Sequence, residues 1–250
     1  KISSSTIPYN DNKALPPTPQ TPPIPEDLPP LLLNSVGSGL SELPVTALTD
    51  YARCPQRFKL HLIDGHPGLG EGLAFGMQIG TLVHKALEHN ITQAQDLIPF
   101  ADGDCSTEVF TEAIVLAQRF FQLPMYHHFR QTAVAKEQQI SWQLGSITFN
   151  GVIDLVGNNW VLDYKSDRQI QPTDHRFQLG VYAQALGHNN AHIAYLRHDH
   201  IHSFSPAELK AIAQETTILS QQIEAGNYLA TPTMEKCAIC PYIAFCDDAM

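Results

Sequence analysis

The sequence predicts a mixed α/β fold, in which helices flank a mixed β-sheet, and three observations support it. Over residues 140–149 of the 250-residue chain, apolar and polar side chains alternate as they do in half-buried strands, and two further short strands are expected at 152–156 and 160–165. A strand, a helix and a second strand follow one another over residues 160–197, an order that favours a right-handed crossover between parallel strands. Helical patterns with one apolar face, at 107–123 and 206–225, could cover the sheet.

The first part of the chain differs in composition from the rest. Ten of the 18 prolines lie within residues 1–44. Proline fixes its own φ and lacks an N–H, so such a stretch favours extended segments over helix or central strand. We therefore expect a linker or arm over residues 1–43 and one folded domain over 44–250. A ligand for a proline-reading domain is the alternative, with Pro16 to Pro19 as a PxxP match.

Composition and charge exclude several classes of protein. The apolar stretches fall far short of a membrane span, and no basic and then apolar leader opens the chain, so we expect a cytoplasmic protein. The formal net charge of −10 excludes a generally basic nucleic-acid coat, although a local site could hold nucleic acid through metal ions. The five cysteines are an odd number and do not resemble a secreted disulfide scaffold.

Helices are expected on the N-terminal side of the strands. Thr46 can cap a helix that runs toward Cys54, and Pro55 favours a break or a new first helical turn. Residues 65–76 are rich in glycine and are expected to form a loop. Pro124 ends the last of these helices because it cannot continue one. The expected helices span residues 46–54, 55–62, 76–89 and 107–123.

Strands and two further helices are expected after them. Gly145 and Ser146 predict a turn between two alternating stretches. A helix over residues 174–186 separates the last two strands. Ser205 and Glu208 form a capping box that begins a helix over residues 206–225. The expected strands span residues 140–144, 147–149, 152–156, 160–165 and 191–197.

Two aspartates are predicted to face each other in the hairpin that these strands form. If Asn158 and Asn159 are its two-residue loop, Asp154 lies directly opposite Asp163, about 5 Å away at Cβ. Lys165 follows two residues later and shares that face. Opposed carboxylates in an apolar strand pair repel each other, and a divalent cation between them removes this cost. Oxygen ligands suit Mg²⁺ or Mn²⁺, beside which Lys165 could orient water or stabilise a phosphate transition state.

The pattern of Asp154, Asp163 and Lys165 also allows an arrangement without a metal. The alternative is a surface hairpin with an Asp–Lys ion pair, and a longer loop would shift the register. In the expected register, the apolar side chains of the opposite face are Ile153, Leu155, Leu162 and Tyr164.

This hairpin resembles the core of PD-(D/E)xK nucleases, as found in RecB-type enzymes. In that family an Asp closes one strand motif, and Asp154 matches it. An Asp/Glu-x-Lys sits on the next strand, matched by Asp163-Tyr164-Lys165. The resemblance implies that the fold is the restriction-endonuclease-like core of this superfamily.

Further family features occur in the same order along residues 44–248. His84, in the segment Gly-Thr-Leu-Val-His, matches a helix-borne histidine that supports the metal. Gln178 and Tyr182 match a QxxxY element on the helix after the DxK strand, and their spacing places them on one helix face. Glu137 is a looser match to a glutamate that precedes the first hairpin in related proteins.

The resemblance implies a role for each matched residue. His84, Asp154, Asp163 and the carbonyl of Tyr164 would hold Mg²⁺ or Mn²⁺. Lys165 would position the attacking water. Gln178 and Tyr182 would support the DNA or the DxK strand, with Glu137 as a further supporting residue.

Four of the five cysteines form a pattern of metal-ligand type. Cys237, Cys240 and Cys246 give C-x₂-C-x₅-C, and three clustered thiols need a fourth ligand. In iron–sulfur members of the RecB-type nucleases and related CRISPR-associated exonucleases, one cysteine before the core, here Cys54, joins three after it. The resemblance thus implies a [4Fe–4S] cluster that joins the two ends of the domain. Zinc is the chemical alternative, and Cys105 remains a plain thiol.

The resemblance implies a metal-dependent DNA exonuclease that acts on DNA ends in recombination or repair. DNA and a helicase domain or subunit would be its partners. The order of Thr46, Leu48, Tyr51, Cys54 and Pro55 is closer to the RecB/AddB type than to the CRISPR-associated type, which stays an alternative. The same residues would also suit a non-catalytic DNA-binding or scaffold module, or a zinc-stabilised interaction domain.

Basic residues and a histidine run complete the candidates. The basic residues could contact DNA phosphates, although a solvated surface fits equally well. They are Arg53, Arg57 and Lys59 beside the first cysteine, and Lys165, Arg168 and Arg176 around the DxK strand. His198, His200 and His202 alternate, which predicts an exposed strand edge or a zinc-like site.

Overall fold

The computed structural model describes residues 40–68 and 72–250, without the side chains of 72–75. The arm expected over residues 1–43, with its PxxP match, lies outside the described residues apart from 40–43. Glu42 and Leu43 already belong to a first strand, so the sheet begins within the range expected for the arm.

Helices account for most of the described chain outside the strands. Among the described residues, no helix combines the length and the apolar character needed to cross a membrane. The α-helices are α1 (Ala47–Arg53), α2 (Pro55–Phe58), α3 (Gly72–His89), α4 (Thr107–Gln122), α5 (His127–Thr132), α6 (Pro172–Leu186), α7 (Pro206–Glu224) and α8 (Met234–Ala238). Short 3₁₀ or π segments are η1 (Lys59–Ile63), η2 (Ala94–Phe100), η3 (Pro124–Tyr126) and η4 (Ile243–Phe245).

Several local predictions are confirmed, and two are wrong. Ser205 accepts from the N–H of Glu208, whose side chain accepts from Ser205, so the capping box is present. Pro55 begins a new helix. Thr46, however, makes no side-chain hydrogen bond to α1, which starts without that cap. The loop expected over residues 65–76 gives way to α3 at Gly72.

The sheet is mixed, as predicted. Its strands are β1 (Glu42–Pro44), β2 (Ala133–Leu144), β3 (Ile147–Gly157), β4 (Trp160–Lys165), β5 (Asn190–Tyr195) and β6 (His200–Phe204). They lie in the order β1-β3-β4-β5-β6, and β2 pairs with β3. The β1–β3 and β4–β5 pairs are parallel and the others antiparallel. Helix α6 connects the parallel strands β4 and β5, which confirms the predicted strand–helix–strand unit.

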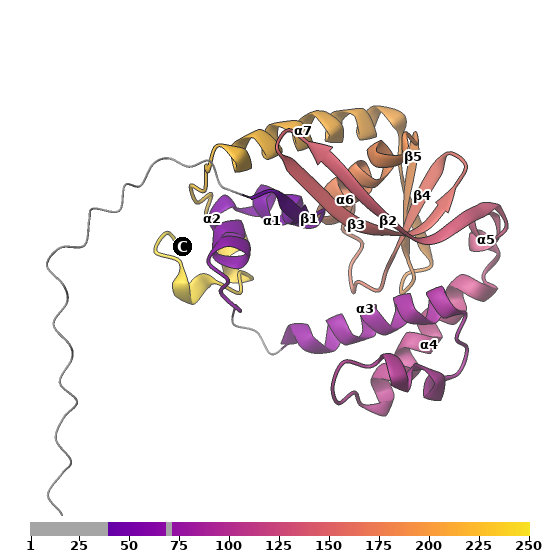
Figure 1. The fold of residues 1–250 in the computed structure, drawn as a ribbon. Coiled ribbons are helices and arrows are strands. Elements are labelled where there is room, and N and C mark those ends of the chain that lie inside the picture. Colours follow the sequence, from indigo (N-terminus) through magenta and orange to yellow (C-terminus); the bar gives the residue numbers. More distant parts are fainter. Residues whose placement is uncertain (1–39, 69–71) are drawn as a thin grey trace, which may run out of the picture. The chain divides into compact units, whose positions relative to one another are not determined.

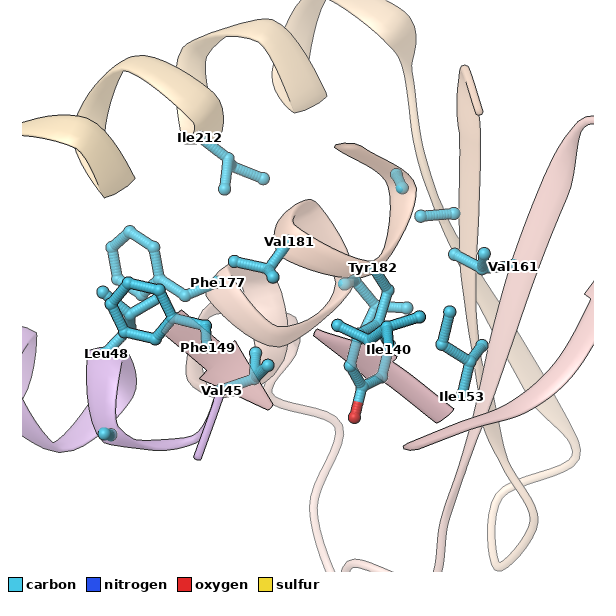
Figure 2. Close-up of a cluster of buried hydrophobic side chains, with 14 of the residues drawn as sticks. Val45, Leu48, Ile140, Phe149, Ile153, Val161, Phe177, Val181, Tyr182 and Ile212 are labelled. Carbon is cyan, nitrogen blue, oxygen red and sulfur yellow. The ribbon is translucent and has the colours of Figure 1, made fainter. Parts of the chain in front are cut away.

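Helices cover both faces of this sheet (Figure 1). One apolar cluster joins β3 and β5 to α1, α6 and α7, and Figure 2 shows part of it, with Phe149, Phe177 and Ile212. A second cluster joins β4 to α3, α4 and α5 on the opposite side. The strands between them are buried on both faces, which explains why the hairpin sequence is apolar on both sides.

The β3–β4 hairpin has the predicted register. Leu155 pairs with Leu162 and Val156 with Val161. The predicted faces are partly wrong, because Ile153 lies in the cluster of α6 and α7 whereas Leu155 and Leu162 lie in the cluster of α3 and α4. The alternation of β3 therefore breaks at Asp154.

Strand β3 changes partners at this same point. Its residues 148–150 pair with β1, and its residues 155–156 pair with β4. Between them lies Gly151, where an added Cβ would approach Tyr182 Cε1 to 2.8 Å. Because Gly151 has no side chain, the Tyr182 ring of α6 can pack directly against β3. The candidate site forms beside this part of β3, between its β1-paired and β4-paired residues.

Candidate active site

Asp154 lies in β3, and both of its carboxylate oxygens have partners. The backbone N–H of Tyr164 on β4 donates to Oδ2 at 2.6 Å, and His84 Nδ1 on α3 lies 2.9 Å from Oδ1. Only 5% of the Asp154 surface is exposed. The neighbouring strand and a helix packed on the sheet therefore fix this carboxylate in a place that largely excludes water.

A group with the character of a metal site surrounds this carboxylate. In the part of the chain that the structure describes, His84, Glu137 and Asp154 are the one group of three or more candidate ligands with all ligand atoms within 4.8 Å of one another. Burial lowers the pKa of His84, but the Asp154 carboxylate opposes this and raises it to about 9. Burial, and then the Asp154 charge, raise the pKa of Glu137 to about 7. One nitrogen and several oxygen donors, with carboxylates that repel each other, suit Mg²⁺ or Mn²⁺.

Glu137 reaches this group through an unusual backbone conformation. The pairs Lys136–Leu155 and Gln138–Ile153 place it opposite Asp154 in the β2–β3 ladder. Its φ is 48°, in the left-handed region that costs a non-glycine residue about 1–2 kcal/mol. Strained residues of this kind persist where the surrounding structure enforces them, often at functional sites. The family resemblance implied only a supporting role for Glu137, and no local sequence pattern signals its conformation.

Asp163 and Lys165 lie on the next strand, β4. Lys165 Nζ is 2.6 Å from Asp163 Oδ2, and both side chains are largely buried. Burial lowers the pKa of Lys165, but the carboxylates of Asp163 and then Asp154 outweigh it, so that its pKa is raised. The ammonium is therefore held charged beside two carboxylates.

Helix α6 supplies the other contacts of Lys165. Its Nζ donates to Gln178 Oε1 at 3.2 Å, and Gln178 Nε2 donates to the Tyr182 hydroxyl at 3.0 Å. The hydroxyl group thus ends a chain of hydrogen bonds that begins at the ammonium. The two residues of the QxxxY element lie where they can orient Lys165.

The two aspartates have different partners in the structure. The β3–β4 ladder ends at Leu155–Leu162, and Asp154 then turns to the Tyr164 N–H and to His84. Asp163 is engaged by Lys165 instead. The group of candidate ligands contains Glu137 in place of Asp163.

A cavity of about 830 Å³ opens beside these residues. His84, Tyr164, Lys165 and Gln178 line it, together with the loop after β4 and the end of α1 near Arg53. The buried carboxylates thus lie next to a space that has polar walls. Its size falls within the range of cavities that hold small ligands or short segments of a polymer.

Most of the basic residues predicted to contact DNA are already paired. The pairs are Arg53–Asp174 at 3.0 Å, Arg57–Asp50 at 3.1 Å, Lys59–Asp64 at 2.8 Å, Lys165–Asp163 at 2.6 Å and Arg176–Glu215 at 2.6 Å. Arg168 lines the cavity, is exposed, and has no ion-pair partner among the described residues.

The four cysteines of the predicted ligand set line one small pocket of about 30 Å³. The backbone N–H of Thr231 lies 3.5 Å from Cys54 Sγ. Burial raises the pKa of Cys54, but N–H groups, first that of Thr231, reverse this and lower it. Across the described chain no three of these sulfurs lie within 4.8 Å of one another, so the structure does not show an iron–sulfur cluster. Cys105 lines a different cavity.

The histidines of the alternating run agree in part with the expected strand edge, because β6 is the last strand in the sheet order and His200 is exposed. His200 and His202 lie on β6, but within the described residues they belong to no group of three candidate ligands. His198 Nε2 instead donates to the Asp167 carbonyl at 3.1 Å. Asp167 also lies 2.7 Å from His175 Nε2, and both residues line the cavity. No sequence pattern indicated the Asp167–His175 pair, although Asp167 follows Lys165 by two residues and His175 precedes Gln178 by three.

Comparisons with known proteins agree with this architecture. A crystal structure of a candidate exonuclease from Eubacterium rectale has a TM-score of 0.55 over 77% of this chain and 84% of that one; at 12% identity it supports the fold alone. A crystal structure of SSO0001 aligns over 83% of this chain and 86% of that one at 15% identity, but its TM-score of 0.43 is too low to indicate a common fold. No curated protein matches. The family model of the PD-(D/E)XK nuclease superfamily matches residues 42–247, and the chain therefore belongs to this superfamily.

Proposed function

We propose that this nuclease hydrolyses DNA phosphodiesters in a reaction that depends on Mg²⁺ or Mn²⁺, as an exonuclease acting on DNA ends in recombination or repair. One observation carries the proposal: a buried Asp154 has ligand atoms of His84 and Glu137 within 4.8 Å, beside an ion pair of Asp163 and Lys165. Such a costly set of buried charges is expected where it performs chemistry.

The donor set fits a hard divalent cation. His84, Glu137 and Asp154 would hold it, and Asp163 and the Tyr164 carbonyl remain candidate ligands from the neighbouring strand. When bound, the ion would supply Lewis-acid stabilisation of the phosphate and an acidified water.

The chain's own residues would position and stabilise the reacting groups. Lys165 keeps its charge and is held in place by Asp163 and Gln178, so it can stabilise the negative charge that develops on the phosphate and orient the attacking water. Tyr182 fixes the Gln178 amide. The cavity beside them would receive the DNA backbone.

The test compares the parent protein with Asp163→Ala and Lys165→Ala on end-labelled linear DNA, single- and double-stranded, with Mg²⁺ or Mn²⁺. The parent should degrade the DNA to short products, whereas each variant should lose about 10²–10³-fold or more in rate. Lys210→Ala is the matched control, because Lys210 is exposed on α7 and does not line the cavity. Closed circular DNA should resist an exonuclease. DNA binding without cleavage by the parent would contradict the proposal and favour a scaffold module.

We also propose that Cys54, Cys237, Cys240 and Cys246 hold a [4Fe–4S] cluster. The shared pocket supports this, as does the resemblance of the four-cysteine pattern to that of the iron–sulfur nucleases. Iron and acid-labile sulfide in anaerobically purified protein would support the cluster. One zinc per chain without iron would overturn it.

The RecB/AddB type is the subgroup of the superfamily that we propose for this chain. We assign the chain to the RecB/AddB type, with a nuclease domain over residues 44–250 and a linker over 1–43 that leads to a helicase domain or subunit. The support is the order of residues around Cys54 and the proline-rich composition. Stimulation of DNA degradation by a helicase and ATP, lost when residues 1–39 are deleted and β1 is left intact, would be the expected result.

A further inference from the structure

Beside Lys165, a carboxylate and an imidazole form a second polar pair in the cavity. We propose that His175, oriented by Asp167, donates a proton to the sugar oxygen that leaves during phosphodiester hydrolysis. The inference rests on the proposed function and deepens it, because it supplies a proton for the leaving group.

The Asp167–His175 pair lies beside the contact between Lys165 and Gln178. Lys165 Nζ donates to Gln178 Oε1 at 3.2 Å, and Asp167 Oδ2 lies 2.7 Å from His175 Nε2. His175 and Gln178 are three residues apart on α6, so their Cβ atoms are about 5–6 Å apart on one helix face. The Lys165–Gln178 and Asp167–His175 contacts therefore join the end of β4 and the loop after it to α6. All four residues line the same cavity.

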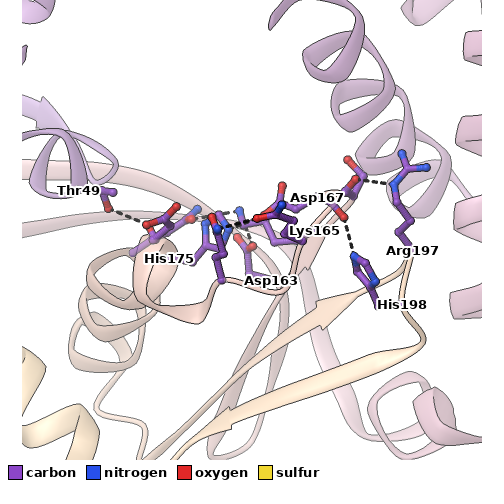
Figure 3. A network of polar contacts seen from close by, with 12 residues as sticks. Thr49, Asp163, Lys165, Asp167, His175, Arg197 and His198 are labelled. Carbon is purple, nitrogen blue, oxygen red and sulfur yellow. Dashed lines mark hydrogen bonds and ion pairs between the residues drawn. The ribbon is translucent and has the colours of Figure 1, made fainter. Parts of the chain in front are cut away.

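The backbone around Asp167 is held by three contacts from the segment that follows β5, and Figure 3 shows Arg197 and His198 of this segment. The N–H of Leu196 donates to the Lys165 carbonyl at 2.9 Å. Arg197 Nε donates to the Ser166 carbonyl at 3.1 Å, and His198 Nε2 to the Asp167 carbonyl at 3.1 Å. Burial raises the pKa of Asp167, but the His175 hydrogen bond and charge outweigh it and lower that pKa. Asp167 is thus a fixed, ionised carboxylate.

His175 remains accessible from the cavity. Its side chain is 19% exposed, and its Nε2–H donates to the Asp167 carboxylate. Within the described residues no hydrogen bond engages Nδ1. A carboxylate on one ring nitrogen orients an imidazole and leaves the other nitrogen for the substrate, which is the arrangement that proton-transfer histidines use.

The proposed step requires only water and the phosphodiester. A water oxygen forms a bond to phosphorus and its proton passes to solvent. The bond between phosphorus and the bridging sugar oxygen breaks, and its electron pair stays on that oxygen. The Nδ1 proton of the His175 imidazolium moves to the oxygen, which leaves as a hydroxyl, and solvent in the cavity returns a proton to the ring. Asp167 acts only by positioning His175.

Sulfur substitution separates proton donation from a structural tie between the loop and α6. The variant His175→Gln keeps an amide that can reach Asp167 but has no transferable proton. Two oligonucleotide sets carry sulfur in place of the 3′- or the 5′-bridging oxygen of one linkage. A thiolate leaves without protonation, so a substrate with sulfur at the leaving position does not need the acid.

Single-turnover rates in Mn²⁺ give distinct outcomes. We expect His175→Gln to cleave ordinary linkages about 10²-fold or more slowly than the parent does. On one of the two sulfur-containing substrates, the variant and the parent should cleave at nearly the same rate. That rescue also shows that the variant is folded. Equal loss on all substrates, or parental rates on ordinary DNA, would overturn the inference while leaving the proposed function intact. A parent that cleaves no substrate would overturn both.

Discussion

The carboxylate site and the cysteine pocket differ in what fixes their side chains. At the carboxylate site, hydrogen bonds with Tyr164, His84 and Gln178 fix side chains whose positions the sheet and helices already determine. At the cysteine pocket, the thiols share a small space but receive few contacts from the protein. The first site is therefore preorganised by the fold, whereas we expect the second to require its ligand for its final geometry.

This difference predicts that the carboxylate site can lose its chemistry without losing its fold. In Asp154→Asn the amide is nearly the same size and its oxygen can still accept the Tyr164 N–H, but the negative charge is gone. We expect a loss of about 10³-fold in the rate of DNA cleavage and a melting temperature close to that of the parent. Single-turnover cleavage and thermal unfolding measure the two quantities. A large fall in the melting temperature would show that the site is structural and break the comparison.

The cysteine pocket should behave in the opposite way. Cys237→Ser removes a ligand from the cluster that would close the chain between residue 54 and the C-terminal segment. We expect loss of bound metal and a fall in the free energy of unfolding on the order of 3–5 kcal/mol, as for a long covalent loop. Cys105→Ser is the control, since Cys105 lies at another cavity. An unchanged unfolding curve in metal-free protein would contradict a structural role.

Sequence alone predicted the hairpin and its register because these depend on local signals. The Asn158-Asn159 loop sets which residues of β3 and β4 pair, and the pairs Leu155–Leu162 and Val156–Val161 follow. The capping box at Ser205 is similarly local. The contacts of Lys165 with α6 could be anticipated only through the resemblance to a known family.

Long-range contacts account for what could not be predicted. Glu137 takes a left-handed conformation because of its place opposite Asp154, not because of its neighbours in sequence. Asp167 and His175 meet because α6 returns along β4. The break in alternation at Asp154 has the same origin, since β3 there passes from one partner strand to another.

The number of protons released when Mn²⁺ binds should show whether His84 and Glu137 are ligands. A metal needs His84 neutral and Glu137 ionised, but the pKa values of about 9 and about 7 mean that both hold protons in slightly acidic solution. Mn²⁺ affinity should therefore rise with pH, with about two protons released per ion near pH 6 and about one near pH 8. Calorimetry in buffers of different ionisation enthalpy measures this number. Glu137→Gln should release about one proton at both values, and pH-independent Mn²⁺ binding would exclude these ligands.

The smallest effect concerns the cavity beside the carboxylate site. Arg168 is exposed there without an ion-pair partner among the described residues, whereas Arg176 is bound to Glu215 at 2.6 Å. An unpaired guanidinium can contact a DNA phosphate without first breaking an ion pair. Arg168→Ala should weaken DNA binding by roughly threefold to tenfold and reduce the slope of log K against log salt by about 1. Binding is measured in EDTA, where a metal-dependent enzyme cannot cut, with Arg176→Ala as the matched control. Equal effects of the two substitutions would mean that general surface charge, not the cavity, attracts the DNA.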